Sequence, residues 1–189
     1  DYTADSYAVL AAAVNVDNMN ALKASSTAEQ IAEAVQSIRN AIDGLVLRAT
    51  DMDAYRDKIQ FKSEAGDYTE DTYAEYKEAY DVLMALDSST GNVSADEFQA
   101  AKARFENAQA ALKMIKADYT KVDEALAKVP ADLSIYTDAT VKTLKDAIAK
   151  VDRNQPLSKQ AEVDAYADAI NDAINNLVVK SKSDDGKGN

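Results

Sequence analysis

The stretch DYTEDTYAEYKEAY at positions 67–80 decides the fold, because the chain contains two further copies of it. DYTADSYAVLAAAV at 1–14 and IYTDATVKTLKDAI at 135–148 align with it without a gap. Each copy reads Tyr-Thr, two further residues, Ser or Thr, and then an apolar stripe with helical spacing. The tyrosines that open the copies lie 66 and 68 positions apart. A repeat of this length predicts units of three helices each.

The shared motif has the composition of a helix start. Thr3, Thr69 and Thr137 stand where an N-cap belongs, and we predict that their hydroxyls accept a free backbone N–H. The tyrosine before each threonine is placed to pack on the residue five positions later, as a hydrophobic staple. We therefore interpret these tyrosines as structural.

Each repeat has a polar gap after its first helix, at about 17–25, 87–93 and 152–157. A second helix is predicted to follow each gap. Ser26-Thr27-Ala28-Glu29 and Ser94-Ala95-Asp96-Glu97 both match the capping box. The third copy begins at Ser158 and lacks the acid three residues later, so its cap is predicted to be weaker.

Composition favours helices and excludes several kinds of chemistry. The 189 residues include 5 Gly and 2 Pro, no Cys, no His and no Trp, and the formal net charge is −12. Lack of His removes the commonest general base and metal ligand. The negative charge opposes binding to nucleic acid or to an anionic membrane surface, and no apolar run approaches a membrane span of about 18 residues. We expect no cofactor, no metal, no nucleic acid and no membrane insertion.

The triplet Asp118-Tyr119-Thr120 repeats the opening motif, so it could start a new helix. Apolar or small residues nevertheless keep alternating steps of three and four straight through it, which favours one continuous helix from about Ala95 to Val129. These residues are Phe98, Ala101, Phe105, Ala108, Leu112, Ile115, Tyr119, Val122, Leu126 and Val129. A second continuous and bent helix is predicted from about Thr27 to Ser63, with Gly44 inside it.

The predicted fold is all-α: elongated tandem three-helix bundles that share long continuous inter-module helices. The expected domains are an incomplete module of second and third helices at 1–49, a module at 50–113, a module at 114–180 and a disordered tail at 181–189. We expect the chain to be a segment of a longer protein.

Residues 117–178 resemble a FIVAR module ("found in various architectures"). The matching features are Tyr119 and Leu126, Pro130, Leu133 followed by Tyr136-Thr137, and a closing pattern of apolar residues. That pattern comprises Ala169, Ile170, Ala173, Ile174 and Leu177. Residues 54–113 match more loosely, without the proline and with Gly66 at the turn, and 1–46 match only the last two helices. The resemblance implies a non-catalytic segment of a large secreted or wall-anchored bacterial protein, often a glycoside hydrolase or adhesin, and it defines no catalytic residues.

The sequence predicts no catalytic, cofactor-binding or metal-binding residue. Three candidate sites were possible: a carboxylate pair, a calcium loop and an exposed aromatic platform for a glycan. Paired carboxylates are inevitable among 33 acids, but catalysis needs a pocket that separates their pKa values. The loop at 87–92 resembles a calcium loop, yet its glycine falls one place early and the acid at the twelfth position is missing. Tyr73, Tyr76 and Tyr80 have core spacing, which leaves Phe61 as the one aromatic residue without a structural role.

The expected function is that of a non-catalytic spacer or interaction segment, outside the cell or anchored to its wall. The alternative is a binding module for a host protein or a glycan, recognised on a helix face, and we expect a monomer. A glycan platform would need exposed aromatic rings, whereas protein binding through a helix face requires no motif.

Overall fold

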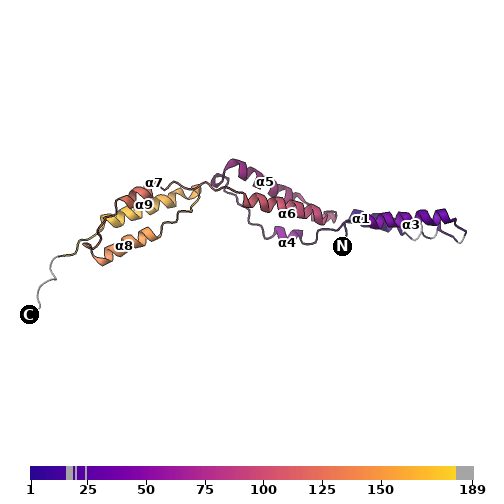
Figure 1. Cartoon of the computed structure of the whole chain (residues 1–189), viewed down its shortest axis with the longest axis horizontal. Coiled ribbons are helices and arrows are strands. Elements are labelled where there is room, and N and C mark those ends of the chain that lie inside the picture. Colours follow the sequence, from indigo (N-terminus) through magenta and orange to yellow (C-terminus); the bar gives the residue numbers. More distant parts are fainter. Residues whose placement is uncertain (16–18, 20, 24, 182–189) are drawn as a thin grey trace, which may run out of the picture. The chain divides into compact units, whose positions relative to one another are not determined.

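The computed structural model describes residues 1–15, 19, 21–23 and 25–181. Over these residues it contains eight α-helices and no strand, which confirms the predicted all-α class (Figure 1). The helices are α1 (Ala4–Ala13), α3 (Ala28–Asp43), α4 (Met52–Arg56), α5 (Glu70–Ala85), α6 (Ala95–Ala110), α7 (Thr120–Ala127), α8 (Asp138–Ala149) and α9 (Gln160–Asn175). Short 3-10 turns occupy Ala65–Asp67, Ser88–Thr90 and Leu157–Lys159.

The repeated threonines lie where the sequence predicts them, but their hydroxyls act differently. Thr3 and Thr137 are the N-cap residues of α1 and α8, and neither side chain accepts a capping hydrogen bond. The Thr3 hydroxyl instead donates to the Ser6 hydroxyl at 2.8 Å, and Thr137 pairs with Thr140 in the same way at 3.0 Å. The threonine hydroxyl that was predicted to cap the helix is therefore hydrogen-bonded to the Ser or Thr three residues later in the motif.

The second helices begin with caps close to the predicted positions. Ser94 accepts the backbone N–H of Glu97 at 3.1 Å, as its pattern predicts. In α3 the capping box is formed by Thr27 and Gln30, one residue later than predicted. Gln30 can replace a glutamate here because its amide oxygen accepts the N–H of Thr27. Most of the predicted gap at 17–25 and the predicted disordered tail beyond Ser181 lie outside the described residues.

The continuous helix predicted from Ala95 to Val129 is wrong. Helix α6 ends at Ala110 and α7 begins at Thr120, with a non-helical linker between them. The apolar spacing does continue across the linker, yet distant backbone segments form hydrogen bonds with it and hold it extended. Tertiary hydrogen bonding here overrides the local pattern.

The continuous helix predicted from Thr27 to Ser63 is wrong for the same reason. Helix α3 ends at Asp43, and Gly44 is its C-cap rather than an interior residue. The chain is then non-helical until the short helix α4. The inter-module helices of the predicted fold class are therefore absent from both junctions, 44–51 and 111–119.

The chain divides into two compact units, each with its own hydrophobic core. Unit 1 consists of residues 1–62 and 71–112, and unit 2 consists of residues 63–70 and the chain from 113 onward. The unit 1 core is formed by Met52, Tyr76, Ala79, Leu83, Val93, Phe98, Ala101, Phe105 and Ala108. The unit 2 core is formed by Ala117, Val122, Ala125, Leu144, Val163, Ala167, Ile170 and Ala173. The predicted domain limits at 49, 113 and 180 stay predictions.

Candidate functional site: linkers with hydrogen bonds on both edges

A pair of backbone hydrogen bonds closes the helix pair α1–α3. The Thr3 N–H donates to the Val46 carbonyl at 2.8 Å, and the Arg48 N–H donates to the Asp1 carbonyl at 3.1 Å. Tyr2 and Leu47 lie between these bonds and form an isolated antiparallel bridge. We name this arrangement the clasp. It joins the residue before the first helix of a pair to the residues after the second helix.

The same clasp closes the other two helix pairs, α5–α6 and α8–α9, with the bridges Tyr68–Met114 and Tyr136–Val179. Its bonds are Thr69 N–H to Lys113 carbonyl at 2.9 Å, Ile115 N–H to Asp67 carbonyl at 2.8 Å, Thr137 N–H to Val178 carbonyl at 2.8 Å and Lys180 N–H to Ile135 carbonyl at 2.8 Å. The repeated Tyr-Thr motif is therefore one of the two backbone segments that pair in each clasp. Its tyrosines occupy the bridge positions between the two bonds, which are formed by the residues before and after each tyrosine.

Two of these linkers also form hydrogen bonds along their opposite edge. In unit 1, Ala49 N–H donates to the Val93 carbonyl at 3.0 Å, and Ala95 N–H donates to the Leu47 carbonyl at 2.8 Å. In unit 2 the corresponding bonds are Ala117 N–H to Gln155 carbonyl at 3.0 Å and Leu157 N–H to Ile115 carbonyl at 3.0 Å. Residues 46–49 and 113–117 are thus each paired on both sides, which satisfies backbone groups that a helix would otherwise satisfy.

Asp67 supports the unit 2 linker with a buried carboxylate. The residue is only 6% exposed, and its carboxylate accepts the Ser158 backbone N–H and the Ser158 hydroxyl, both at 2.7 Å. Its own carbonyl accepts Ile115, so one residue holds both the linker and the start of the 3-10 turn before α9. A buried carboxylate requires such donors, because burying it without them is costly. No local pattern indicates this pairing, since the partners are 91 positions apart in the chain.

The triplet Asp118-Tyr119-Thr120 does start a helix, contrary to the prediction that it lies inside one. The Asp118 carboxylate accepts the backbone N–H of Thr120 at 2.9 Å and its hydroxyl at 2.6 Å. These two bonds lower the pKa of Asp118. Thr120 is the first residue of α7, so Asp118 supplies the acceptor that the new helix end needs.

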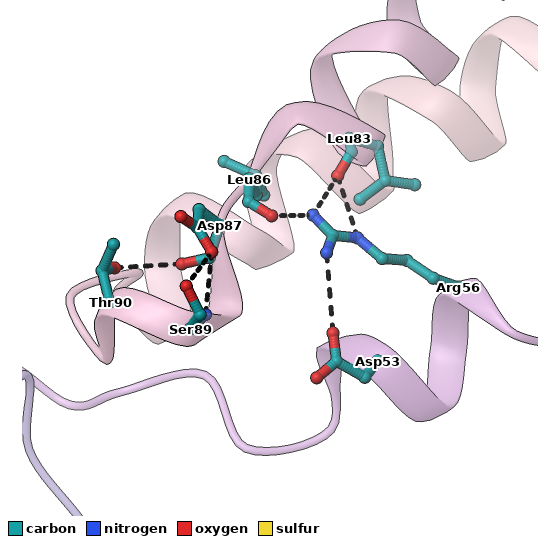
Figure 2. A network of polar contacts seen from close by, with 7 residues as sticks. All are labelled: Asp53, Arg56, Leu83, Leu86, Asp87, Ser89 and Thr90. Atoms are coloured by element: carbon teal, nitrogen blue, oxygen red, sulfur yellow. Dashed lines mark hydrogen bonds and ion pairs between the residues drawn. The ribbon is translucent and has the colours of Figure 1, made fainter.

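A polar network around Arg56 closes the other end of α5 in unit 1 (Figure 2). The guanidinium donates to the Leu83 carbonyl from Nε at 3.1 Å and from Nη2 at 2.6 Å, and it also donates to the Leu86 carbonyl. Asp53 lies 3.6 Å from the third guanidinium nitrogen. Arg56 is therefore a side-chain cap for the free carbonyls at the end of α5, a structural rather than a catalytic role.

The acceptors of the loop at 87–92 form hydrogen bonds within the protein. The Asp87 carboxylate accepts the hydroxyl and the backbone N–H of Ser89, which lower the pKa of Asp87 (Figure 2). At the other end, the Asn92 side-chain oxygen accepts the N–H of Asp5 at 2.9 Å, so the loop caps α1. Gly91 has φ +68, which favours glycine there. Over the described part of the chain, no group of three or more acids could hold a metal ion.

One groove on the described residues does not bring two carboxylates together. It has a volume of about 680 Å³ and lies between α1 and α3. Its lining residues are Val9, Ala12, Ala13, Glu33, Gln36, Ser37, Asn40 and Ala41, with Glu33 as the single acid. Paired carboxylate catalysis needs two acids at a controlled distance.

No helix among the residues that the structure describes is both long and apolar enough to span a membrane.

Phe61 has a structural role, contrary to the sequence-based interpretation. Its ring stacks on Tyr76 with a centroid distance of 5.4 Å and an interplanar angle of 10°, and it lies 4.3 Å from the Tyr80 ring. The prediction that Tyr73, Tyr76 and Tyr80 belong to the core is confirmed. Phe61 is therefore not a free platform for a sugar ring.

A search against models of known protein families finds no match to this chain.

Proposed function

We propose that this chain is a non-catalytic spacer or interaction segment of a large secreted or cell-surface bacterial protein. The observation that carries the proposal is the clasp, which recurs with the same two backbone bonds in all three helix pairs. Repeats joined by identical junctions give a molecule whose length grows with repeat number. The side chains of Asp67, Arg56 and Asn92 serve such junctions or helix ends.

The FIVAR resemblance of residues 117–178 adds the context of the proposal. The resemblance implies an extracellular or wall-anchored protein, such as a glycoside hydrolase or an adhesin, and in this proposal its active domain is a separate one. The net charge of −12 suits an exposed, soluble spacer, because like charges oppose self-association. In this proposal the linkers at 46–49 and 113–117 replace continuous helices as the connection between successive modules of an elongated chain.

Duplication of one repeat tests the spacer role. Leu47 and Met114 occupy the same position in successive clasps, so a second copy of residues 47–113 inserted after Lys113 preserves every junction. Small-angle scattering should then show a maximum dimension that increases by about the length of one helix pair. A matched deletion of 47–113 should shorten the molecule by the same amount. An unchanged maximum dimension in both variants would contradict a spacer.

The second candidate is a binding module for a host protein, and one observation favours it over glycan binding. Of the five exposed large apolar side chains in α1 and α3, four are aliphatic, namely Val9, Ile31, Val35 and Ile42, and Tyr7 is the one ring. An apolar helix face suits a protein partner better than a sugar, which needs a stacking ring. A pull-down from host serum and mucin, together with a glycan array, should be blank for a spacer. A reproducible protein hit that Ile31→Asp removes would favour the second candidate.

A further inference from the structure

Helix α3 carries the same apolar register as α9, but Ile31, Val35 and Ile42 of α3 are exposed, whereas Ala41 is buried like its counterpart Ala173. The clasps align Leu47 with Val179, and this alignment sets α3 against α9 without a gap. The aligned pairs are Ile31 with Val163, Val35 with Ala167, Ile38 with Ile170, Ala41 with Ala173, Ile42 with Ile174 and Leu45 with Leu177. Every position is apolar or small in both helices, so the two present equivalent faces.

The two faces differ sharply in exposure. Val163 and Ala167 in α9 are 0% and 2% exposed, whereas Ile31 and Val35 in α3 are 46% and 42% exposed. Ile42 is 51% exposed, at a position whose α9 counterpart is packed against the unit 2 core. Side chains of this size are strongly stabilised by burial. Helix α3 therefore has an apolar face like the one that α9 buries, but no described helix packs over Ile31, Val35 and Ile42.

The covered repeats show what covers such a face. In unit 2, α7 packs on α9 and contributes Val122 and Ala125, both 0% exposed, to the same core as Val163. In unit 1, α4 performs the corresponding task on α6, where the Tyr55 ring meets the Phe98 ring edge-on at 5.8 Å. Phe98 is the α6 counterpart of Ile31 in the clasp alignment. Each covered pair thus uses one short helix that comes ahead of its Tyr-Thr motif.

We propose that the face formed by Ile31, Val35, Ile38 and Ile42 of α3 is a docking site for one short amphipathic helix of the α7 type. That helix has apolar residues at the spacing of Val122, Ala125, Leu126 and Val129 in this chain. The inference rests on the repeated packing and not on the proposed function.

The charges around the face refine the chemistry of the occupant. In unit 2, the Lys128 amine of the segment after α7 lies 3.4 Å from the Asn171 side chain. Arg39 is the α3 counterpart of Asn171, so a lysine on the docked helix would meet a like charge. A helix with a carboxylate at the Lys128 position complements the α3 face better.

An extension of the full chain tests the site. Residues 116–135 are repeated ahead of Tyr2 in place of Asp1, so that the added helix reaches Tyr2 by the connection that α7 uses to reach Tyr136. The added copy carries Lys128→Glu. Because the helix is tethered, its effective concentration at the face is high. The matched control adds the same extension with Val122→Asp and Leu126→Asp in the added copy, which removes its apolar stripe and keeps its length.

Hydrogen exchange of the α3 amides is the measurement, with α9 amides as the internal reference. The apolar extension should slow α3 exchange by about tenfold or more relative to the control extension, and leave α9 unchanged. Equal α3 exchange in the two extended chains would overturn the proposal. Sedimentation of the chain without the extension measures its oligomeric state, and a monomer supports the proposal. A dimer that Ile31→Asp converts to a monomer would make a second copy the occupant and overturn it.

Discussion

Replacement of Asp67 by alanine should destabilise unit 2 more than any other single change to its linker. The carboxylate is 6% exposed and accepts two hydrogen bonds of 2.7 Å from Ser158. Hydrogen bonds to a charged group contribute roughly 1.5–3 kcal/mol each, and the alanine leaves the Ser158 backbone N–H without its acceptor. Allowing for overlap between two bonds to one group, we expect a loss of about 2–4 kcal/mol in the free energy of unfolding of unit 2.

A double-mutant cycle separates the two bonds. Ser158→Ala removes only the hydroxyl bond and should cost about 1–1.5 kcal/mol. Asp67→Asn keeps an acceptor oxygen for the Ser158 N–H and should fall between the wild type and Asp67→Ala. In the Ser158→Ala background, Asp67→Ala should cost less than in the wild type, because one of its partners is already gone.

Native-state hydrogen exchange of the α9 amides is the assay, since it reports on unit 2 separately from unit 1. Asp1 occupies the position of Asp67 in the first clasp, and its side chain is exposed. Asp1→Ala is therefore the matched control; it lies in unit 1, so it is read on the α3 amides, and it should change the stability of that unit by less than about 0.5 kcal/mol. If Asp67→Ala behaved like this control, the buried carboxylate would have no stabilising role and the reasoning would be refuted.

Three further perturbations test the local structure. Arg56→Met should destabilise unit 1 by about 2–4 kcal/mol in urea unfolding, because carbonyls at the end of α5 lose their donors; exposed Lys58→Met should change it little. Asp118→Ala should lower the thermal midpoint at pH 7, and the difference should shrink as the pH falls through the lowered pKa of Asp118, since the carboxylate gives this stability only while it is ionised. Burial, followed by the hydrogen bond to Glu106, raises the pKa of Tyr55 from 10.0 to about 12. Its contribution is then complete below pH 10 and lost as the pH rises toward 12, so the wild type should lose its advantage over Tyr55→Phe across this interval. A constant difference across the interval would contradict the raised pKa.

Local features of the fold could be predicted from the sequence. The Tyr-Thr motif located the starts of α1 and α8, and the capping pattern at Ser94 located the start of α6. The helical spacing of Phe98 and Phe105 identified core positions correctly. Each of these signals lies within a few residues of the feature that it predicts, so no knowledge of distant partners was needed.

The linkers could not be predicted, because their conformation depends on partners far along the chain. Ile115 bonds to Asp67 on one edge and to Leu157 on the other, and neither interaction leaves a local pattern. The apolar spacing at Leu112 and Ile115 fits a helix equally well, so periodicity alone gave the wrong answer. A comparison of 46–49 with 113–117 could have revealed them, because Leu47 lies 45 residues after Tyr2 and Met114 lies 46 residues after Tyr68.

The side-chain roles at the junctions were missed for a related reason. Asn92 caps α1 through the N–H of Asp5, 87 positions away, although the loop resembled a cation site in sequence. Phe61 lacked a partner at helical spacing but, from a non-helical segment, stacks on the Tyr76 ring of α5. In both cases the local sequence defines the donor or the ring, and only the tertiary fold supplies its partner.

The extended linker between α6 and α7 is the central claim, and NMR of residues 111–119 tests it most directly. The carbon chemical shifts of Met114–Ala117 should be those of extended backbone. The amides of Ile115 and Ala117 should exchange slowly, because they donate to the Asp67 and Gln155 carbonyls. Helical shifts that run unbroken from Ala110 to Thr120 would contradict the clasp and restore a continuous helix.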